Sequence, residues 1–338
     1  MLETIWFLLW GILWAIYFVL DGFDLGLGTI MPCLAKNDTE RRIIYNAMGP
    51  FWDGNEVWLI TAGGVTFAAF PKAYAVMFSG LYTALMLLLI ALIIRGVSFE
   101  FRNKVDSPGW RKIWDTCLVI GSFLPALLLG VAFANIFKGL PIDKQGIVQG
   151  NLFSLLNPYG LVGGILFVLL FVEHGALWLA YRSTGDLQIR SGNMAAKVWP
   201  IKVVVLVGFL IYSFLATKLF TNYFKTPMLF LLLILPIGGV ILSRVYISTQ
   251  KWLSAWIASA CTIAGTTLFG IVGIYPALLP SSLNPAYSIT IYNSASSTLT
   301  LQIMLGVVAV FIPLVIGYQF WVYKTFSHPI STHEKLEY

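Results

Sequence analysis

Apolar residues recur along the chain in runs of roughly 20, separated by short polar segments. A helix of that length crosses the ~30 Å hydrocarbon layer of a bilayer. The alternating pattern typical of a transmembrane β-strand is absent from the sequence. The pattern predicts an all-α polytopic membrane protein, with one integral membrane domain over residues 1–338. We expect nine transmembrane helices, near residues 5–31, 54–70, 74–97, 114–137, 159–181, 199–220, 228–247, 252–274 and 301–323.

The same pattern suggests how these helices are organised. The second is short, and Pro71 begins the third. Two four-helix sets plus a ninth helix are a natural grouping of these spans. The first helix follows no basic segment and offers no clear small-residue cleavage site, so we interpret it as a retained helix rather than a signal peptide.

Composition agrees with a membrane protein. Hydrophobic residues make up 58% of the chain and charged residues 11%, with a mean hydropathy of +0.83. Such a composition excludes an ordinary soluble core. Cys33, Cys117 and Cys261 form no Cys-x-x-Cys pair and lie in or beside apolar runs, so we interpret them as reduced packing residues without a metal or redox role.

Orientation follows from Lys and Arg, which gather in the cytoplasmic loops of membrane proteins. All but five of the 21 fall in the loops after the odd-numbered helices, beside the start of the sixth helix, or in the C-terminal segment. We therefore expect a periplasmic N-terminus, a cytoplasmic C-terminus and a cytoplasmic tail over 324–338. The net charge of +6 suits anionic lipid at the cytoplasmic surface and does not indicate nucleic-acid binding. The five exceptions are Lys72, Lys138, Lys144, Lys218 and Lys225.

Ionisable residues are costly inside a bilayer, so they mark pathways or buried contacts. Asp21 lies ~24 Å along the first helix from Ile5, at ~1.5 Å per residue. This depth is close to the expected cytoplasmic boundary. Asp24 shares the same face one turn further on. Gly22 and Gly26 form a Gly-x-x-x-Gly motif, which lets another helix approach closely.

The segment GPFWDGNEVWLI places polar residues at the cytoplasmic start of the second helix, near the aspartates of the first. In one interpretation Asp53 and Glu56 form a capping box, which satisfies free amide groups at a helix start. In the other, Asp53, Asn55 and Glu56 border a wet vestibule through which protons enter. The two interpretations are compatible, because a cap can also line such a vestibule.

Further ionisable groups are expected at the same depth. Arg95 ends the third helix and Asp115 begins the fourth, so an Asp24–Arg95–Asp115 cluster could hold three helix ends together. Glu173 and His174 lie ~21 Å into the fifth helix from its outer start. A carboxylate beside an imidazole can exchange protons near neutral pH, and a hydrogen-bonded contact between helices is the alternative.

The outer half of the expected bilayer holds almost no acid or base, apart from Glu3 at its edge. A pump that carries ions across the whole membrane would be expected to show such groups on both sides of the midplane. The distribution instead favours proton uptake from the cytoplasm to a site that consumes protons.

Histidine is scarce, although membrane redox centres depend on it for axial ligands. Of the three histidines, His328 and His333 fall in the expected tail, which leaves His174 alone within the bilayer. One histidine cannot support a multi-haem chain, and no pattern indicates a copper or non-haem iron site. We therefore predict no metal site and no catalytic residue in this chain, with redox chemistry largely in a partner subunit.

Aromatic residues suggest one more contact. Trp6, Trp10 and Trp14 share one face of the first helix. A quinone or lipid contact is one interpretation of this face, and ordinary packing is the other.

Several segments resemble a known family. They occur in the family's order and cover nearly the whole chain: DGFDLGLG, NDTERRIIYNAMGPFWDGNEVWLITAGGVTFAAFP, WDTCLVIGSFLPALLLGVAFANI, LLNPYGLVGG, YRSTGDLQIR and YPALLPSSLNPAYSITIYNSASSTLTLQIM. They closely resemble subunit II of the cytochrome bd-type quinol oxidases. The WDGNEVWL block and the SSxxTL segment are quite specific to this family.

The resemblance implies a role in aerobic respiration at the inner (cytoplasmic) membrane of a bacterium. It implies nine helices, in two four-helix bundles with one peripheral helix, and a heterodimer with subunit I. Subunit I of the family holds two haem b groups and one haem d, and small accessory single-helix subunits can join the complex. The family oxidises quinol at the outer face and reduces dioxygen to water with cytoplasmic protons, which generates a proton motive force. Subunit II supports subunit I, helps protons to enter and can hold a structural quinone.

The resemblance also implies roles for individual residues. Asp21 and Asp53 match the family's proton-entry carboxylates. Asp24, Arg95 and Asp115 match its structural charge cluster. The family often has glutamine at the position of Glu56, and the Glu173–His174 pair has no confident match, so a proton-pathway role for these three residues stays open.

Two other functions remain as alternatives. A proton-coupled secondary transporter would need a substrate site near the midplane, usually at broken helices. Pro125 and Pro236 could break helices, but no charged residue lies beside them. A purely structural scaffold subunit would keep full oxygen consumption after neutral replacement of Asp21 and Asp53.

Overall fold

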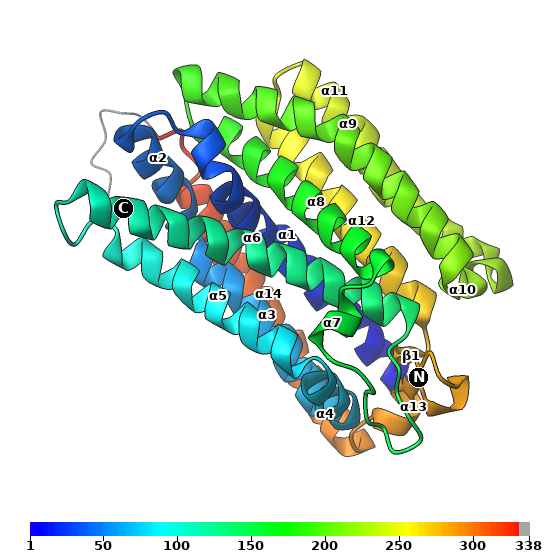
Figure 1. Cartoon of the computed structure of the whole chain (residues 1–338). Coiled ribbons are helices and arrows are strands. Elements are labelled where there is room, and N and C mark those ends of the chain that lie inside the picture. The colour runs from blue at the N-terminus through cyan, green and yellow to red at the C-terminus, as the bar shows by residue number, and fades with distance from the viewer. Residues whose placement is uncertain (331–338) are drawn as a thin grey trace.

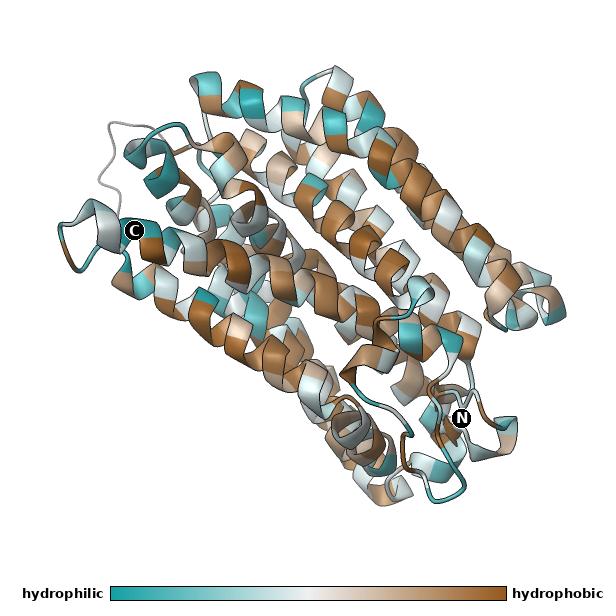
Figure 2. Cartoon of the chain, viewed as in Figure 1, coloured by the Kyte–Doolittle hydropathy of each residue, from teal (hydrophilic) through white to brown (hydrophobic). Residues whose placement is uncertain are grey.

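The computed structural model describes residues 1–330 and is built almost entirely of helices that run side by side (Figure 1). The helices are apolar along most of their length and polar near their ends (Figure 2). Within the described residues, eight helical segments are long and apolar enough to cross a membrane: α1 (Leu2–Leu34), α5 (Tyr82–Phe101), α6 (Pro108–Lys138), α8 (Pro158–Arg182), α9 (Gly185–Ala216), η1 with α11 (Pro227–Ser248), α12 (Trp252–Ile274) and α14 (Thr298–Thr325).

Shorter elements connect these segments. α3 (Trp52–Ala69) and α4 (Pro71–Gly80) precede α5, and α2 (Asp38–Met48) lies between α1 and α3. The remaining short helices are α7 (Leu152–Leu155), α10 (Thr221–Lys225), η2 (Pro285–Tyr287) and α13 (Ile291–Ser294). β1 (Ala277–Leu279) and β2 (Ile289–Thr290) form a small antiparallel pair.

Three of the expected spans differ most from the helices observed. α3 is a helix of 18 residues at the expected second span, but it is not among the eight apolar segments. The expected third span is divided at Leu81 into α4 and α5. Gly80 packs there against the loop before α7, so closely that an added Cβ would lie 2.3 Å from Val148. α9 begins at Gly185, well before residue 199. Its first turns are polar, so hydropathy did not predict them, but they continue a helix that packs against α8.

The structure adds one helix that hydropathy did not predict. α2 is short and amphipathic, and its N-cap Asn37 accepts a hydrogen bond from the Glu40 backbone N–H at 2.9 Å. Short polar helices leave no signal in a pattern that selects apolar runs. α2 nevertheless matters, because it brings Asp38 and Arg41 to the same end of the molecule as the termini of α1, α5 and α8.

α1 is the central helix of the fold. It contacts α3, α6, α8 and α12, while α9 and α11 lie along one side of the molecule (Figure 1). Its closest neighbour is α8: a Cβ on Gly26 would lie 1.7 Å from the Phe171 carbonyl oxygen, and one on Gly175 would lie 2.4 Å from the Leu27 nitrogen. The close helix approach predicted from Gly22 and Gly26 is therefore confirmed.

α14 lies at the periphery of the helical assembly. It contacts α1 and α3, and Leu301 is its one buried residue. The predicted tail over 324–338 begins inside this helix, because α14 continues to Thr325. The part of that tail over 331–338, with His333 and Lys335, lies outside the described residues.

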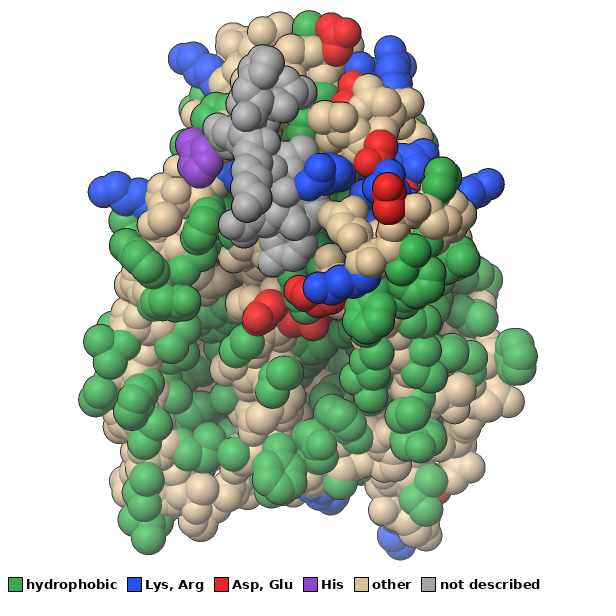
Figure 3. Space-filling model, turned by 90° about the vertical axis from the view of Figure 1, so that its left-hand side faces the viewer, with side chains coloured by type: hydrophobic (Ala, Val, Ile, Leu, Met, Phe, Trp, Pro, Cys, Tyr) green, Lys and Arg blue, Asp and Glu red, His purple; other side chains and the backbone are tan. Residues whose placement is uncertain are grey.

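The two ends of the helices differ in charge. We call the end that holds α2, the α5–α6 loop and the α8–α9 turn the basic end. Charged side chains crowd one part of the face shown in Figure 3, with apolar side chains below them. At the opposite end, the segment between α12 and α14 forms the β1–β2 pair and bonds to neighbouring loops, for example from the Leu140 N–H to the Pro280 carbonyl at 2.9 Å.

The structure gives little support to the hypothesis that Pro125 and Pro236 break membrane-spanning helices. Pro125 lies inside a continuous α6, and Pro236 lies in the first turn of α11 after the 3₁₀ turns of η1. A mid-membrane substrate site of the transporter type needs unwound backbone at that depth. α6 offers none at its proline.

Candidate functional site

Three helices bring ionisable side chains together toward the basic end. Arg95 of α5 donates hydrogen bonds through Nη2 to Asp21 Oδ1 of α1 at 2.6 Å and to Glu56 Oε1 of α3 at 2.5 Å. The Asp21 and Arg95 side chains are fully buried, whereas 24% of the Glu56 side chain is exposed. We call Asp21, Glu56 and Arg95 the Arg95 triad. Its two carboxylates share one guanidinium, so the triad can take up a proton and still keep an ion pair.

The triad continues deeper along α1. Tyr17 lies one helical turn before Asp21 and is fully buried. Among residues 1–330, the Tyr17 hydroxyl and the second carboxylate oxygen of Asp21 make no hydrogen bond of good geometry, although the two groups lie close enough to interact with each other. Unpaired polar atoms in a protein interior are costly, and they point to a functional group or to ordered water. Sequence analysis missed Tyr17, although its i, i−4 spacing from Asp21 could have found it.

Asp24 belongs to a neighbouring hydrogen-bond network. Asn55 donates to Asp24 Oδ2 at 2.7 Å and to the Leu20 carbonyl at 3.0 Å. The Asn55 oxygen accepts hydrogen bonds from Tyr323 at 3.0 Å and from Gln319 at 3.2 Å. This network attaches the peripheral α14 to α1 and α3. The sequence singled out Asn55, but nothing in it connected Tyr323 or Gln319 with this site.

Asp53 lies at the surface in the first turn of α3. The expected capping box with Glu56 is wrong. The N-cap of α3 is Phe51, which makes no side-chain cap, and Glu56 is instead held by Arg95. Asp53 is thus a solvent-exposed carboxylate one turn from the partly exposed member of the triad.

The expected Asp24–Arg95–Asp115 cluster is also wrong. Asp115 accepts hydrogen bonds from Arg102 Nε at 2.6 Å and from Arg41 Nη1 at 3.0 Å. Arg102, the C-cap residue of α5, lies two helical turns beyond Arg95, or ~10 Å further along the chain. The start of α6 lies level with Arg102, so the predicted cluster is divided between two arginines.

The second arginine forms what we call the Arg102 network, which consists of Arg41, Asp38, Arg102 and Asp115. Arg102 Nη2 donates to Asp38 Oδ1 at 2.6 Å, which attaches α2 to the end of α5. Partial burial acts to raise the pKa of Asp38, but the hydrogen bond and charge of Arg102 outweigh it and hold this pKa below its ordinary value. Asp38 therefore stays ionised at neutral pH.

Glu173 and His174 engage different helices. Glu173 forms an ion pair with Lys202 of α9, and both side chains are fully buried. Lys202 was expected at a helix start near the cytoplasmic surface, but α9 begins much earlier and carries it into the interior. His174 Nδ1 lies 2.5 Å from Ser259 Oγ, and Nε2 lies 3.1 Å from the Val19 carbonyl oxygen.

These contacts limit what His174 can bind. A carbonyl oxygen can only accept, so Nε2 carries a hydrogen in its bond to Val19. The other ring nitrogen is engaged by Ser259, and the ring stacks on Trp256 at a centroid distance of 5.0 Å. An axial haem ligand must present a free ring nitrogen, so His174 in this arrangement does not fit that role. Within residues 1–330, no group of three or more His, Cys, Asp or Glu side chains could hold a metal ion.

The three tryptophans of α1 do not form a lipid-facing surface. Trp6 donates to the Leu301 carbonyl at 3.1 Å and Trp10 donates to Thr66 Oγ1 at 2.8 Å, and both side chains are buried. These two are packing residues, which corrects the interpretation of a quinone or lipid contact. Trp14 differs, because it lines an apolar lateral groove of about 790 Å³ between α3, α4, α5 and α6, and no described residue accepts a hydrogen bond from its indole N–H.

The solvent exposure of these ionisable groups decreases step by step from the surface to the interior. Asp53 is exposed, Glu56 is partly exposed, and Asp21 and Tyr17 are buried. Carboxylates and a phenol can each hold or release a proton, whereas a permanently charged guanidinium can only organise them. The arrangement is suited to receiving protons at the basic end and passing them inward.

Comparison with known proteins gives consistent results. Residues 2–326 match the family described as cytochrome bd terminal oxidase subunit II. The chain is 36% identical to cytochrome bd ubiquinol oxidase subunit 2 of Bacillus subtilis, over 100% of this chain and 99% of that protein. It is 37% identical to cytochrome bd-I ubiquinol oxidase subunit 2 of Escherichia coli K12, over 95% and 93% of the two chains.

Solved structures give a match in fold. A chain from the structure of bd oxidase from Geobacillus thermodenitrificans superposes with a TM-score of 0.77 at 19% sequence identity. The superposition covers 96% of this chain and 98% of the other.

Proposed function

Since the chain belongs to the cytochrome bd terminal oxidase subunit II family, we propose that it feeds protons through the Arg95 triad to the site where its partner reduces dioxygen. The chain is a multi-pass protein of a bacterial membrane and the second subunit of an oxidoreductase complex that contains haem. Its partner is subunit I of that complex. The specific role proposed here is proton supply and support of that partner.

The orientation that this role requires places the basic end in the cytoplasm and the N-terminus in the periplasm. Excess Lys and Arg on cytoplasmic segments supports it. Every electron that reaches dioxygen must be matched by a proton to form water. If quinol releases its protons at the outer face while these protons come from the cytoplasm, the turnover generates a proton motive force.

One observation carries the proposal. The Arg95 triad connects a partly exposed carboxylate, Glu56, to a fully buried one, Asp21. Asp53 would collect protons at the surface, Glu56 would receive them, and Arg95 would hold both carboxylates of the triad in place. Tyr17 extends the series inward and supplies a hydroxyl that can take part in a hydrogen-bonded proton relay.

We place the haem groups, two haem b and one haem d, in subunit I. They supply electron transfer and dioxygen binding when present. In this chain, the engagement of both ring nitrogens of His174 argues against a haem ligand. The large groove beside Trp14 fits a structural quinone or a lipid, because its wall is apolar apart from a few groups such as the indole N–H.

A tag on this chain tests the assignment of partner and cofactors. We expect the purified complex to contain subunit I and to give a reduced-minus-oxidised spectrum with both b-type and d-type haem bands. The chain expressed alone should bind little haem, since it offers no suitable axial ligand. Stoichiometric haem in the isolated chain would contradict the assignment.

Replacing Glu56 with glutamine tests the entry of protons into the triad. The amide oxygen can still accept from Arg95, but the side chain no longer carries a proton. We expect oxygen consumption to fall roughly two- to fivefold at alkaline pH, well below the ~10²–10⁴-fold contribution of an essential acid–base group, because Asp53 and Asp21 remain.

The measurement is the pH profile of quinol-driven oxygen consumption by the purified complex. Glu100, an exposed carboxylate near the end of α5, provides the matched control as Glu100→Gln. Identical profiles for Glu56→Gln, Glu100→Gln and the unaltered complex would remove Glu56 from the pathway.

A further inference from the structure

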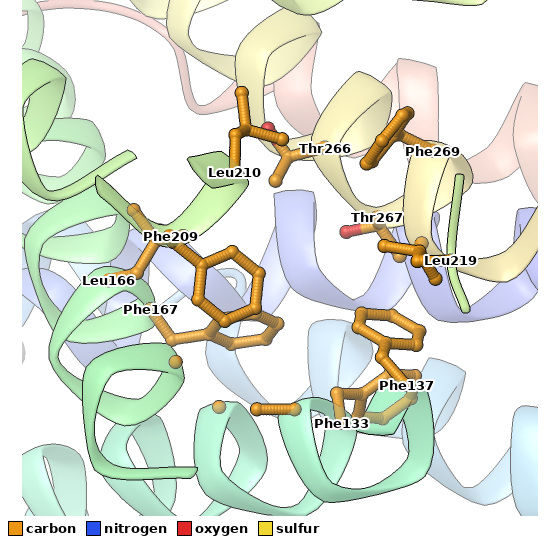
Figure 4. Close-up of a pocket in the computed structure, with 14 residues that line it drawn as sticks. Phe133, Phe137, Leu166, Phe167, Phe209, Leu210, Leu219, Thr266, Thr267 and Phe269 are labelled. Carbon is orange, nitrogen blue, oxygen red and sulfur yellow. The ribbon is translucent and has the colours of Figure 1, made fainter. Parts of the chain in front are cut away.

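A small enclosed cavity lies among α6, α8, α9 and α12, far from the Arg95 triad in the sequence and built from none of its residues (Figure 4). Its volume is about 20 Å³. Aromatic rings form most of its wall, with Phe133 and Phe137 from α6 facing Phe167 of α8 and Phe209 of α9 (Figure 4).

Glycines leave the backbone close to this cavity. Gly270 of α12 packs on the ring of Phe137, where an added Cβ would lie 2.2 Å from Cζ. Gly163 of α8 packs on Ala134, where an added Cβ would lie 2.5 Å from the methyl carbon. The helices therefore meet closely around the cavity, and the remaining space is a defined hole in an otherwise tight contact.

The cavity offers water few hydrogen-bond partners. Its lining includes two hydroxyl side chains, and each already donates to its own helix. Thr266 bonds to the Thr262 carbonyl at 2.8 Å, and Thr267 bonds to the Ile263 carbonyl at 2.8 Å. Cavities of this kind stay dry and take up apolar atoms or molecules such as xenon. The volume is about that of one water-sized probe, so it suits a single very small molecule.

The cavity shares wall residues with two outward-facing grooves. Leu210, Thr266 and Phe269 line both the cavity and an apolar groove of about 240 Å³ between α9, α11 and α12. On the other side, Phe133 lines both the cavity and the groove of about 790 Å³ beside Trp14. A small molecule that passes between these spaces would have to displace the side chains that they share.

We propose that this cavity is a site for dioxygen, which enters from the bilayer through the α9–α11–α12 groove. Dioxygen is small and apolar, so it dissolves in hydrocarbon and gains from leaving water. The assignment of the ligand rests on the proposed function, because it takes dioxygen as the substrate of the complex. An apolar cavity beside an outward-facing groove would hold this substrate within the membrane-spanning part of the complex.

Xenon binding to the complete oxidase complex tests whether the site exists. We expect a density peak between Phe133, Phe209 and Thr267 in a structure determined under xenon pressure. Thr267→Leu should fill the space and remove the peak. Thr267→Val keeps the side-chain size and should retain the peak.

If the leucine variant fails to assemble, Phe209→Leu provides a second test, because it enlarges the cavity and should strengthen the peak. A structure of the unaltered complex with no xenon there, or with ordered water, overturns the site.

Oxygen kinetics test whether the site serves the reaction. For Thr267→Leu we expect the KM for dioxygen to rise by a factor of roughly two or more while kcat is unchanged. A mutation that weakens binding without altering the chemical step has this effect. A KM equal to that of Thr267→Val overturns the assignment to dioxygen supply. Failure of the proton proposal would instead appear as normal turnover in triad variants, and it would leave the xenon peak in place.

Discussion

Asp21→Asn should abolish most quinol-driven oxygen consumption while the haem spectrum of the complex stays intact. Asparagine has nearly the same shape, and its Oδ1 can still accept the hydrogen bond that Arg95 donates to Asp21 at 2.6 Å. It cannot bind and release a proton. Because Asp21 is the fully buried carboxylate of the triad, the parallel entry available at Glu56 does not bypass it. We expect a loss in turnover of about 10²-fold or more, the range for an essential acid–base group.

The measurement is oxygen consumption per haem in the purified complex, together with proton uptake after reconstitution into vesicles. Asp115→Asn is the matched control, because Asp115 also bonds to an arginine but belongs to the Arg102 network. That control should turn over normally once assembled. An assembled Asp21→Asn complex with normal turnover would contradict proton supply and favour a purely structural subunit.

Lys202→Met should strongly destabilise the complex. The lysine forms an ion pair with Glu173, and neither side chain is exposed. Removing one partner of a buried pair leaves the other charge uncompensated, at a cost of about 3–5 kcal/mol. The cost should be near the upper part of that range, because both groups lie well inside helices expected to cross hydrocarbon. We expect a lower melting temperature of the purified complex and a reduced yield.

The double variant Lys202→Met with Glu173→Gln separates charge from packing. It removes both charges, so it should recover most of the stability that Lys202→Met loses. Lys197→Met provides the control, since Lys197 is exposed on the same helix. A Lys202→Met complex as stable as the control would mean that Glu173 carries no charge in the folded protein.

Membrane architecture was the more predictable part of this protein. Long apolar runs must form helices in a bilayer, because hydrocarbon offers no partner for an open backbone. The Gly22–Gly26 motif correctly predicted a close helix contact, because the absence of a Cβ is a local property. The same local reasoning failed where polar residues continued a helix, as in the first turns of α9, and where a short polar helix formed, as in α2.

The candidate site was only partly predictable. Asp21, Glu56 and Arg95 were each singled out from the sequence, yet their mutual contact was not. Arg95 was assigned to Asp24 and Asp115, because the sequence does not give the vertical offset of α6 against α5. That offset places Asp115 level with Arg102, ~10 Å along the chain from Arg95.

By itself, the sequence determined that this chain forms apolar helices, that its carboxylates gather near the basic end, and that it has too few histidines for several haem groups. These properties follow from residue type and from distance along a single helix. Only the tertiary structure decided that Glu56 shares Arg95 with Asp21, that Lys202 pairs with Glu173 and that four helices surround a small apolar cavity. Such contacts depend on the rotation and vertical offset of each helix against its neighbours, which packing sets and which no single helix encodes.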